Sequence, residues 1–186
     1  MNIEQLKQNL TDGSYDSALS KLYGTDPDVL NQQRARYLQA AETFSRLYPE
    51  RSEVSVFSAP GRTEIGGNHT DHQHGCVLAA SVNLDVIAIV AFHQDGVIRL
   101  QSAGYPQDYV ELQDLSVHSE EKGTSAALIR GIVSRFQEMG VTTGGFDAYT
   151  TSNVLGGSGL SSSAAFEVLI GTIIDQHDNE GKAGAV

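Results

Sequence analysis

The sequence is poor in cysteine and in basic residues, and it lacks any long apolar run. Cys76 is the only cysteine, which excludes a disulfide framework and favours a reducing compartment such as the cytoplasm. Lys and Arg number 12 against 23 Asp and Glu, and the net charge of −11 argues against nucleic acid or an anionic membrane as the main partner. No apolar run approaches the ~20 residues that cross a bilayer, and the polar N-terminus lacks a signal-peptide pattern. We expect a soluble, cytoplasmic protein that binds neither nucleic acid nor membranes.

Helical patterns are present at the start, in the middle and near the end of the chain. Residues 1–50 are expected to form helices, one of which begins at Asp26-Pro27, where an N-cap residue precedes a proline at the first helical position. Residues 124–139 repeat apolar side chains at helical spacing and end before Gly140. Residues 164–177 form another apolar run of helical length.

Extended patterns lie between these helices. Residues 54–58 alternate as a strand that Pro60-Gly61 is expected to end. Residues 78–91 are rich in Val, Ile and Ala, as in strands that are covered on both faces. Gln94-Asp95-Gly96 predicts a hairpin turn with residues 97–101 as the return strand. Two shorter extended segments are expected at residues 109–112 and 145–151. The order of elements predicts a mixed α/β (α+β) fold, a mixed sheet with packed helices.

Residues 156–165 are the most informative stretch, with three glycines and four serines placed before an apolar run. Glycines let the backbone approach an anion, and the start of the next helix offers N–H groups and a positive dipole end. Hydroxyls there can bind phosphate oxygens or Mg²⁺. The pattern differs from the common P-loop because no Lys follows the last glycine. Taken alone, the stretch fits both a phosphate-binding loop and an ordinary Gly/Ser linker.

Residues 62–75 form a second unusual stretch, with one Arg, two acidic residues and three His. Four side chains have the chemistry of zinc ligands, although their order differs from that of known zinc hydrolases: His69, Asp71, His72 and His74. Asn68, His69 and Asp71 alternatively suit sugar hydroxyls, which both donate and accept hydrogen bonds. Arg62 suits phosphate oxygens. A plain polar loop is the third interpretation.

Together, the two stretches resemble the galactokinase family, which is one of the GHMP sugar and metabolite kinases. Ser58-Ala59-Pro60-Gly61-Arg62, followed by His69-Thr70-Asp71 and Gly75, is similar to the family's first signature. Residues 157–164 are similar to its ATP-binding motif. The resemblance covers about residues 50–175, and the order and spacing of the two motifs agree with it.

The resemblance implies an enzyme that transfers the γ-phosphoryl group of ATP to the anomeric hydroxyl of galactose, with ATP and Mg²⁺ as cofactors. It implies that Arg62 stabilises charge on the transferring phosphoryl group and that Ser163 reaches Mg²⁺. The implied sugar-binding residues are Asn68, His69, Thr70 and Asp71. The implied ATP-binding residues are Ser102, Gly157, Ser158, Gly159, Leu160, Ser161, Ser162 and Ser163. The expected partners are the sugar and ATP, and we expect a monomer.

The family's fold is a two-domain α/β structure with the active site between the domains. The resemblance implies that residues 51–186 form a domain of the GHMP-kinase N-terminal type, which is ribosomal-protein-domain-2-like. Residues 1–50 are then a helical N-terminal extension, and the C-terminal domain is absent. Because the family's catalytic Asp would lie beyond Val186, we expect this chain to be an N-terminal fragment that is inactive alone.

Three positions depart from the family's pattern. Asn68 stands where Glu is usual, which leaves the sugar open because Asn lacks the charge to accept strongly from a hydroxyl. Glu64 replaces a usual Asn, and Leu155 replaces a usual Pro. The alternatives are a kinase for another sugar, a non-catalytic galactose and ATP sensor that uses the same pocket, and a zinc-dependent hydrolase.

Overall fold

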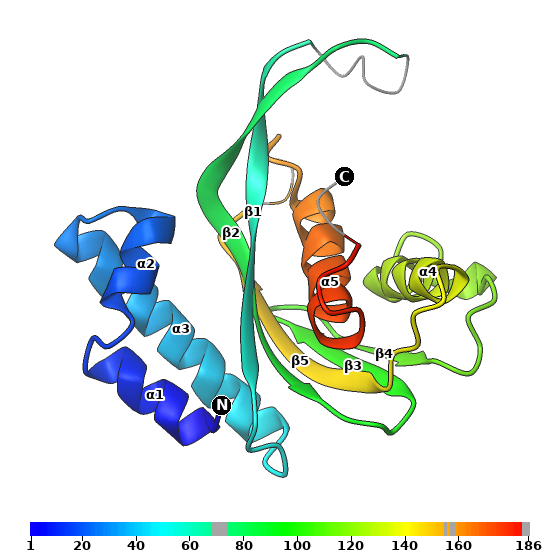
Figure 1. The fold of residues 1–186 in the computed structure, drawn as a ribbon, viewed down its shortest axis with the longest axis horizontal. Helices are drawn as coiled ribbons and strands as arrows, with labels where there is room; N and C mark the ends of the chain where they lie inside the picture. The colour runs from blue at the N-terminus through cyan, green and yellow to red at the C-terminus, as the bar shows by residue number, and fades with distance from the viewer. Residues whose placement is uncertain (68–73, 155, 157–158, 184–186) are drawn as a thin grey trace.

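Five strands form one mixed sheet within residues 1–67, 74–154, 156 and 159–183, the part of the chain that the computed structural model describes (Figure 1). The strands are β1 Ser55–Gly66, β2 Leu78–Phe92, β3 Val97–Ser102, β4 Gln107–Glu111 and β5 Gly145–Ser152. Their order across the sheet is β1-β2-β5-β3-β4. β3 and β5 run parallel, and the other neighbouring strands run antiparallel. The prediction of a mixed α/β sheet is therefore confirmed.

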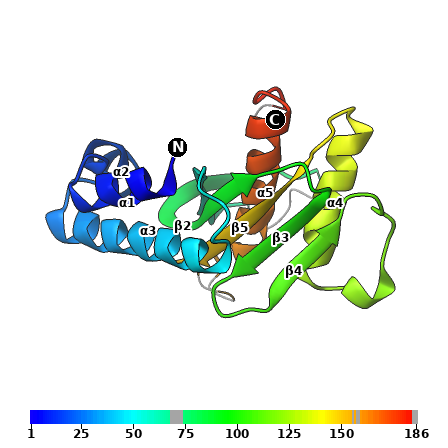
Figure 2. The same cartoon turned by 90° about the horizontal axis from the view of Figure 1, so that it is seen from below.

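Helices cover both faces of this sheet (Figures 1 and 2). In chain order they are α1 Ile3–Thr11, α2 Asp16–Tyr23, α3 Pro27–Leu47, the short 3-10 helix η2 Ser119–Glu121, α4 Ser125–Glu138 and α5 Ser162–Asp178. Ile87 and Ile89 of β2 join the core formed with α1, α2 and α3. Ala88 and Val90 join the core formed with α4 and α5 on the other face. Successive side chains of a strand point to opposite faces, so β2 is buried between the two helical layers.

The first 50 residues are helical, as predicted. The side chain of Asp26 caps α3 by accepting hydrogen bonds from the backbone N–H groups of Asp28 at 2.9 Å and Val29 at 3.4 Å. Tyr37 and Phe44 of α3 are buried in the core that this layer shares with the sheet. These helices therefore cover one face of the sheet, while the domain division at residue 50 stays a prediction.

Strand β1 continues through Pro60-Gly61, so the prediction that this pair ends the strand is wrong. The pairing with β2 changes register there, because Pro60 lies opposite Asp85 whereas Arg62 lies opposite Ser81. β1 is the edge strand of the sheet. Edge strands and bulges tolerate proline because its missing N–H breaks no ladder in the middle of a sheet.

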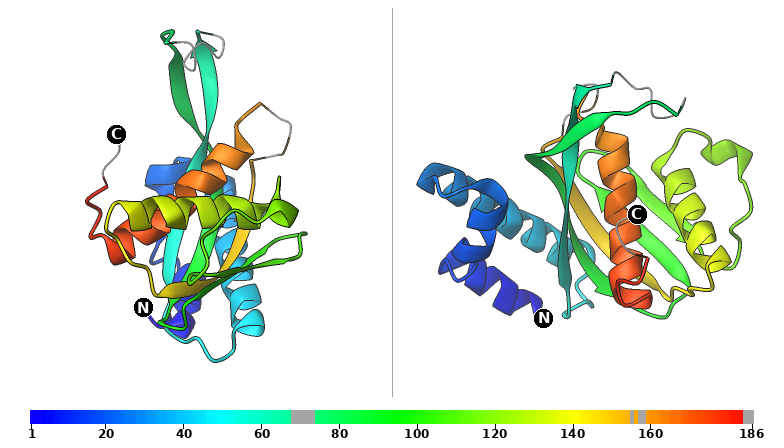
Figure 3. Two further views of the ribbon diagram at one scale, coloured as in Figure 1. Left: turned by 90° about the vertical axis from the view of Figure 1, so that its right-hand side faces the viewer. Right: turned by 45° about the horizontal axis from the view of Figure 1, so that its top comes forward.

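Beyond this register shift, β1 and β2 continue as a two-stranded ribbon that projects from the helical layers (Figure 3). Residues 78–84 of β2 lie in the ribbon and are mostly exposed, whereas residues 85–91 are buried. Coverage on both faces, which composition predicts for the whole run, is thus found only in its second half.

Strand β5 lies between β2 and β3, so the predicted hairpin between those two strands is not formed. The chain does turn at Gln94-Asp95-Gly96, but β5 enters at that turn. The N–H of His93 donates to the carbonyl oxygen of Gly145 at 3.1 Å, and the N–H of Gly96 donates to that of Gly144 at 2.9 Å. A Cβ on Gly145 would lie 2.1 Å from the carbonyl oxygen of Val97, so only glycine permits this close approach.

A buried carboxylate holds β5 to its neighbours at the end of the sheet where β5 begins. Asp147 accepts hydrogen bonds from Arg99 at 2.5 and 3.0 Å and from Arg51 at 2.7 Å. Its side chain is fully buried, and burial alone would raise its pKa. The bonds from Arg99 and Arg51 outweigh burial and lower the pKa of Asp147 below its ordinary value.

Candidate active site

Strand β1 meets the start of α5, so the described ends of the two sequence motifs lie together. The backbone N–H of Arg62 donates to the carbonyl oxygen of Leu160 at 3.1 Å, and its Nε donates to Ser161 Oγ at 3.3 Å. Gly61 permits this approach, because a Cβ there would lie 3.0 Å from Leu160 O and 3.2 Å from the side chain of Val154. The arginine of the first motif therefore lies against the serines of the second.

Ser161 precedes α5 in a left-handed backbone conformation, with φ of 58° and ψ of 55°. This conformation costs a residue other than glycine roughly 1–2 kcal/mol. Ser161 makes no side-chain cap to the helix, and its hydroxyl accepts from Arg62 instead. The start of α5 thus combines the positive end of a helix dipole with a guanidinium, and this combination favours an anion such as phosphate.

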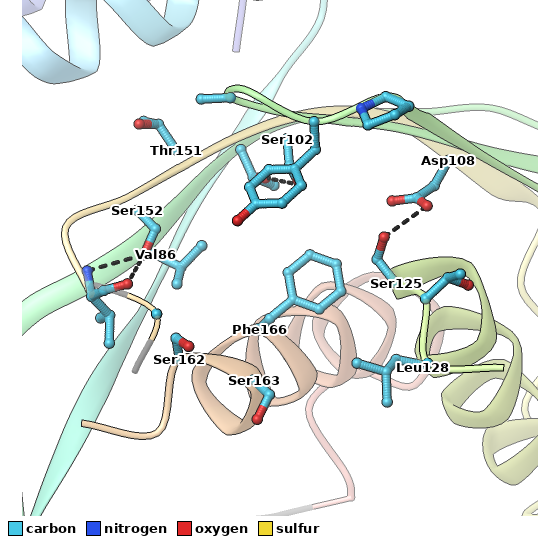
Figure 4. A pocket seen from close by; sticks show the side chains of 18 residues that line it. Val86, Ser102, Asp108, Ser125, Leu128, Thr151, Ser152, Ser162, Ser163 and Phe166 are labelled. Carbon is cyan, nitrogen blue, oxygen red and sulfur yellow. Dashed lines mark hydrogen bonds between the residues drawn. The ribbon is translucent and has the colours of Figure 1, made fainter. Parts of the chain in front are cut away.

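A cavity of about 610 Å³ opens beside the same helix start (Figure 4). Ser162 and Ser163 line one side of it, and Ser102 at the end of β3 lines the opposite side. Ser102 Oγ is hydrogen-bonded to Thr150 Oγ1 at 2.9 Å. The full lining is Val86, Ser102, Ala103, Tyr105, Pro106, Asp108, Gly123, Thr124, Ser125, Leu128, Thr150, Thr151, Ser152, Val154, Gly156, Ser162, Ser163 and Phe166. The structure therefore brings Ser102 and the two serines to one cavity, which is in the size range of small-molecule sites.

The cavity joins apolar walls to one carboxylate, which sequence analysis did not single out. Phe166 and Leu128 supply apolar surface from α5 and α4. At the far end, Ser125 Oγ donates to Asp108 Oδ1 at 2.8 Å (Figure 4). Burial raises the pKa of Asp108, while the hydrogen bonds from Ser125 and from the backbone of Ala126 oppose that rise. No local motif marks Asp108, because its place follows from how β4 and α4 meet.

Several predicted site residues lie outside the described part of the chain: Asn68, His69, Thr70, Asp71, Gly157 and Ser158. Their roles stay predictions, as does the role of the described Gly159. Of the alternative zinc ligands, only His74 is described, and it is exposed. Within residues 1–67, 74–154, 156 and 159–183, no group of three or more His, Cys, Asp or Glu side chains could hold a metal ion. None of the helices in those residues is long and apolar enough to cross a membrane.

Comparison with known proteins agrees with this geometry. Residues 42–92 match the family model described as the galactokinase galactose-binding signature. The chain is 38% identical to the galactokinase of Streptomyces coelicolor over 131 residues. This match covers 69% of this chain and 33% of that protein. The chain is a relative of the galactokinases. The galactokinase of Bacillus subtilis is 30% identical over 138 residues, or 72% of this chain and 35% of that protein.

This galactokinase relative spans about a third of the length of the curated proteins it matches. The galactose complex of Lactococcus lactis galactokinase superposes with a TM-score of 0.66 at 27% identity, covering 72% of this chain and 35% of that one. The mevalonate kinase of Methanococcus jannaschii superposes with a TM-score of 0.55 at 14% identity, over 67% of this chain and 40% of that one, and this likeness concerns the fold alone. The expected GHMP-kinase N-terminal fold is therefore confirmed.

Proposed function

We propose that the complete protein transfers the γ-phosphoryl group of ATP to the anomeric hydroxyl of galactose and so forms galactose 1-phosphate. The contact between Arg62 and Ser161 carries this proposal, because it joins the strand of the galactose-binding signature to the start of α5. A sugar held after β1 and a triphosphate held at α5 would meet at Arg62. The galactokinase relatives support the choice of galactose.

Arg62 is proposed to stabilise the phosphoryl group during transfer. Phosphoryl transfer depends on positioning the reactants and on neutralising charge over the phosphoryl oxygens. The Arg62 guanidinium is permanently charged, and its Nε already points at Ser161 beside the helix start. Residues 157–163 are proposed to bind the ATP phosphates, with Ser162 and Ser163 facing the cavity. Asn68, His69, Thr70 and Asp71 are proposed to bind the sugar hydroxyls.

The cavity beside α5 is proposed to hold the adenosine part of ATP. Phe166 and Leu128 offer apolar surface to a flat base, and Ser102 lies on the opposite wall. Asp108 is proposed to accept a hydrogen bond from the exocyclic amine of adenine. A half-buried carboxylate hydrogen-bonded to Ser125 at 2.8 Å is an acceptor that selects for such a donor.

The cavity also fits a Mg²⁺ ion bound together with ATP. Mg²⁺ takes few ligands from the protein and keeps phosphate oxygens and water for the rest. The Ser163 hydroxyl is an oxygen ligand of that kind and lines the cavity at the start of α5. Once bound, the ion would neutralise negative charge on the phosphates.

We further propose a cytoplasmic monomer whose partners are the sugar and ATP, without nucleic acid or a membrane. The acidic net charge of −11 supports the absence of nucleic acid and of an anionic membrane among the partners, because like charges repel. Size-exclusion chromatography with light scattering tests the monomer, and a mass of twice the chain would contradict it.

Galactose-dependent release of ADP by the complete protein tests the function. Arg62→Ala is expected to lower kcat by roughly 10²-fold or more, while ATP affinity changes less, because the charge matters most during transfer. Arg62→Lys is the matched control, since it keeps the charge and loses the planar fork. Unchanged turnover in Arg62→Ala would remove Arg62 from this role. ATP and galactose binding without turnover would instead identify a sensor, and activity lost to a zinc chelator would identify a hydrolase.

A further inference from the structure

A buried carboxylate lies behind the candidate site, at the point where the β1-β2 ribbon leaves the sheet. Asp85 is only 3% exposed. It accepts hydrogen bonds from Arg36 Nη1 at 2.6 Å, from the Tyr23 hydroxyl at 2.5 Å and from Ser58 Oγ at 2.5 Å. The Tyr23 and Tyr37 hydroxyls are also hydrogen-bonded at 2.8 Å. α2, α3, β1 and β2 therefore all contribute side chains to one buried cluster, which we call the Asp85 cluster.

Arg36 also reaches the strand that leads into the serine stretch. Its Nη2 donates to two backbone carbonyl oxygens, that of Asp85 at 2.9 Å and that of Thr151 at 3.1 Å. The backbone N–H of Asn153 donates to the same Asp85 oxygen at 2.9 Å. Arg36 thus joins α3 to β2 and to the end of β5. Thr151 and Ser152, at that end, line the cavity proposed for adenosine.

The Asp85 cluster lies where two segments begin that meet in the candidate site, one after Ser58 of β1 and one after Asn153. Ser58 is followed along β1 by the register shift and then by Arg62. Asn153 is followed by Val154, whose side chain would lie 3.2 Å from a Cβ on Gly61. A shift of the backbone at Ser58 or at Asn153 would therefore change how Arg62 lies against Ser161.

The stability of the folded protein is a weak reason for Arg36 to be buried. Burying an ion pair costs desolvation free energy, and apolar side chains of similar volume often stabilise a core equally well. Within the described residues, Arg36 Nε is buried without a hydrogen-bond partner, which adds to that cost. The planar guanidinium does fix geometry, because its remaining donors bind the Asp85 carboxylate and two carbonyl oxygens in set directions.

We propose that Arg36 is a positioning residue for phosphoryl transfer, which holds the ends of β1 and β5 so that Arg62 meets the start of α5. This inference rests on the proposed function, because it concerns the placing of that same site. It also gives α3 a task in the site, although this helix does not line the cavity.

Two variants of the complete protein separate positioning from stability. Arg36→Met with Asp85→Asn removes the charge pair and the bond to Thr151, while the amide oxygen can still accept from Tyr23 and Ser58. Tyr23→Phe is the matched control, because it removes the hydrogen bonds of Tyr23 to Asp85 and to Tyr37 and leaves every bond of Arg36. Thermal unfolding gives the stability of each variant. Fluorescence titration with the probe mant-ATP and Mg²⁺ gives nucleotide affinity, and hydrogen exchange reports the amide of Asn153.

The double variant is expected to bind mant-ATP about tenfold more weakly or worse, because small misplacements of binding groups are costly. Its Asn153 amide is expected to exchange faster, whereas Tyr23→Phe keeps the affinity and exchange of the unaltered chain. Unchanged affinity and exchange in a folded double variant would overturn the proposal. Equal weakening by Tyr23→Phe would also overturn it, since stability would then explain the loss.

The remaining outcomes are separable as well. If the double variant does not fold, Arg36→Lys decides, because it keeps the charge and loses the fork; unchanged Asn153 exchange there counts against the proposal. If the complete protein without these substitutions does not bind mant-ATP, the proposed function fails. The exchange of Asn153 then still shows whether Arg36 holds this segment.

Discussion

Replacing Gly61 by alanine is the sharpest test of how β1 and the start of α5 fit together. The new Cβ would lie 3.0 Å from the carbonyl oxygen of Leu160 and 3.2 Å from both methyl groups of Val154. The Leu160 oxygen is backbone and already accepts from the N–H of Arg62 at 3.1 Å, so it cannot turn aside as a flexible side chain would. The two segments must therefore separate by a few tenths of an ångström.

The expected cost follows from this crowding. Overpacking costs roughly 1–3 kcal/mol, and the lower chain entropy of alanine in the unfolded state returns roughly 0.4–1 kcal/mol. The free energy of unfolding should fall by about 1–2 kcal/mol, which lowers Tm by roughly 2–8 °C for a chain of this size. The bond from Arg62 Nε to Ser161 Oγ, already 3.3 Å long, is expected to break, and mant-ATP affinity should fall with it.

Gly66→Ala is the matched control, since a Cβ at Gly66 on the same strand meets nothing within 4 Å. Thermal unfolding and mant-ATP titration of both variants make the comparison. If Gly61→Ala is as stable as Gly66→Ala and binds the nucleotide equally well, the close approach of the two motifs does not matter and the reasoning is refuted.

The other predictions concern separate parts of the molecule. Asp108→Asn should weaken ATP by roughly 2–10-fold, the worth of one hydrogen bond, and GTP by less; equal loss for both nucleotides would contradict base recognition by Asp108. Asp147 has a lowered pKa in the folded protein, so the stability it contributes is present above its ordinary pKa of ~3.9 and is lost as pH falls below that value. Asp147→Asn should therefore lower Tm at pH 7 more than at pH 3, and an equal drop at both would contradict this coupling. The 186-residue chain alone is expected to release no ADP with galactose, and turnover by it would show that the catalytic base lies within it.

Local signals in the sequence predicted the features that depend on neighbouring residues. Asp26-Pro27 marked the start of α3 because the cap and the proline act within one helical turn. The arginine and the serine stretch were singled out for their chemistry, and the Arg62 to Ser161 contact places them together. The sugar-binding residues proposed next to Arg62 stay predictions.

Features set by long-range packing were missed. The turn at Gln94-Asp95-Gly96 is real, but a turn signal does not say whether another strand will enter between its arms, as β5 does. Pro60-Gly61 did not end β1 because an edge strand tolerates a bulge. Asp108 carries no motif, and it becomes a candidate only when α4 brings Ser125 to it.

The position of β5 between β2 and β3 also affects how the protein folds during its synthesis. β2 pairs with β1 on one side and β3 pairs with β4, but the other edge of each strand pairs with β5, which the ribosome delivers only after α4. Until residues 145–152 emerge, both strands carry an unsatisfied edge, which is a surface that other nascent chains can join. Folding that waits for such distant partners is slow, so newly synthesised copies should depend on chaperones until β5 has taken its place.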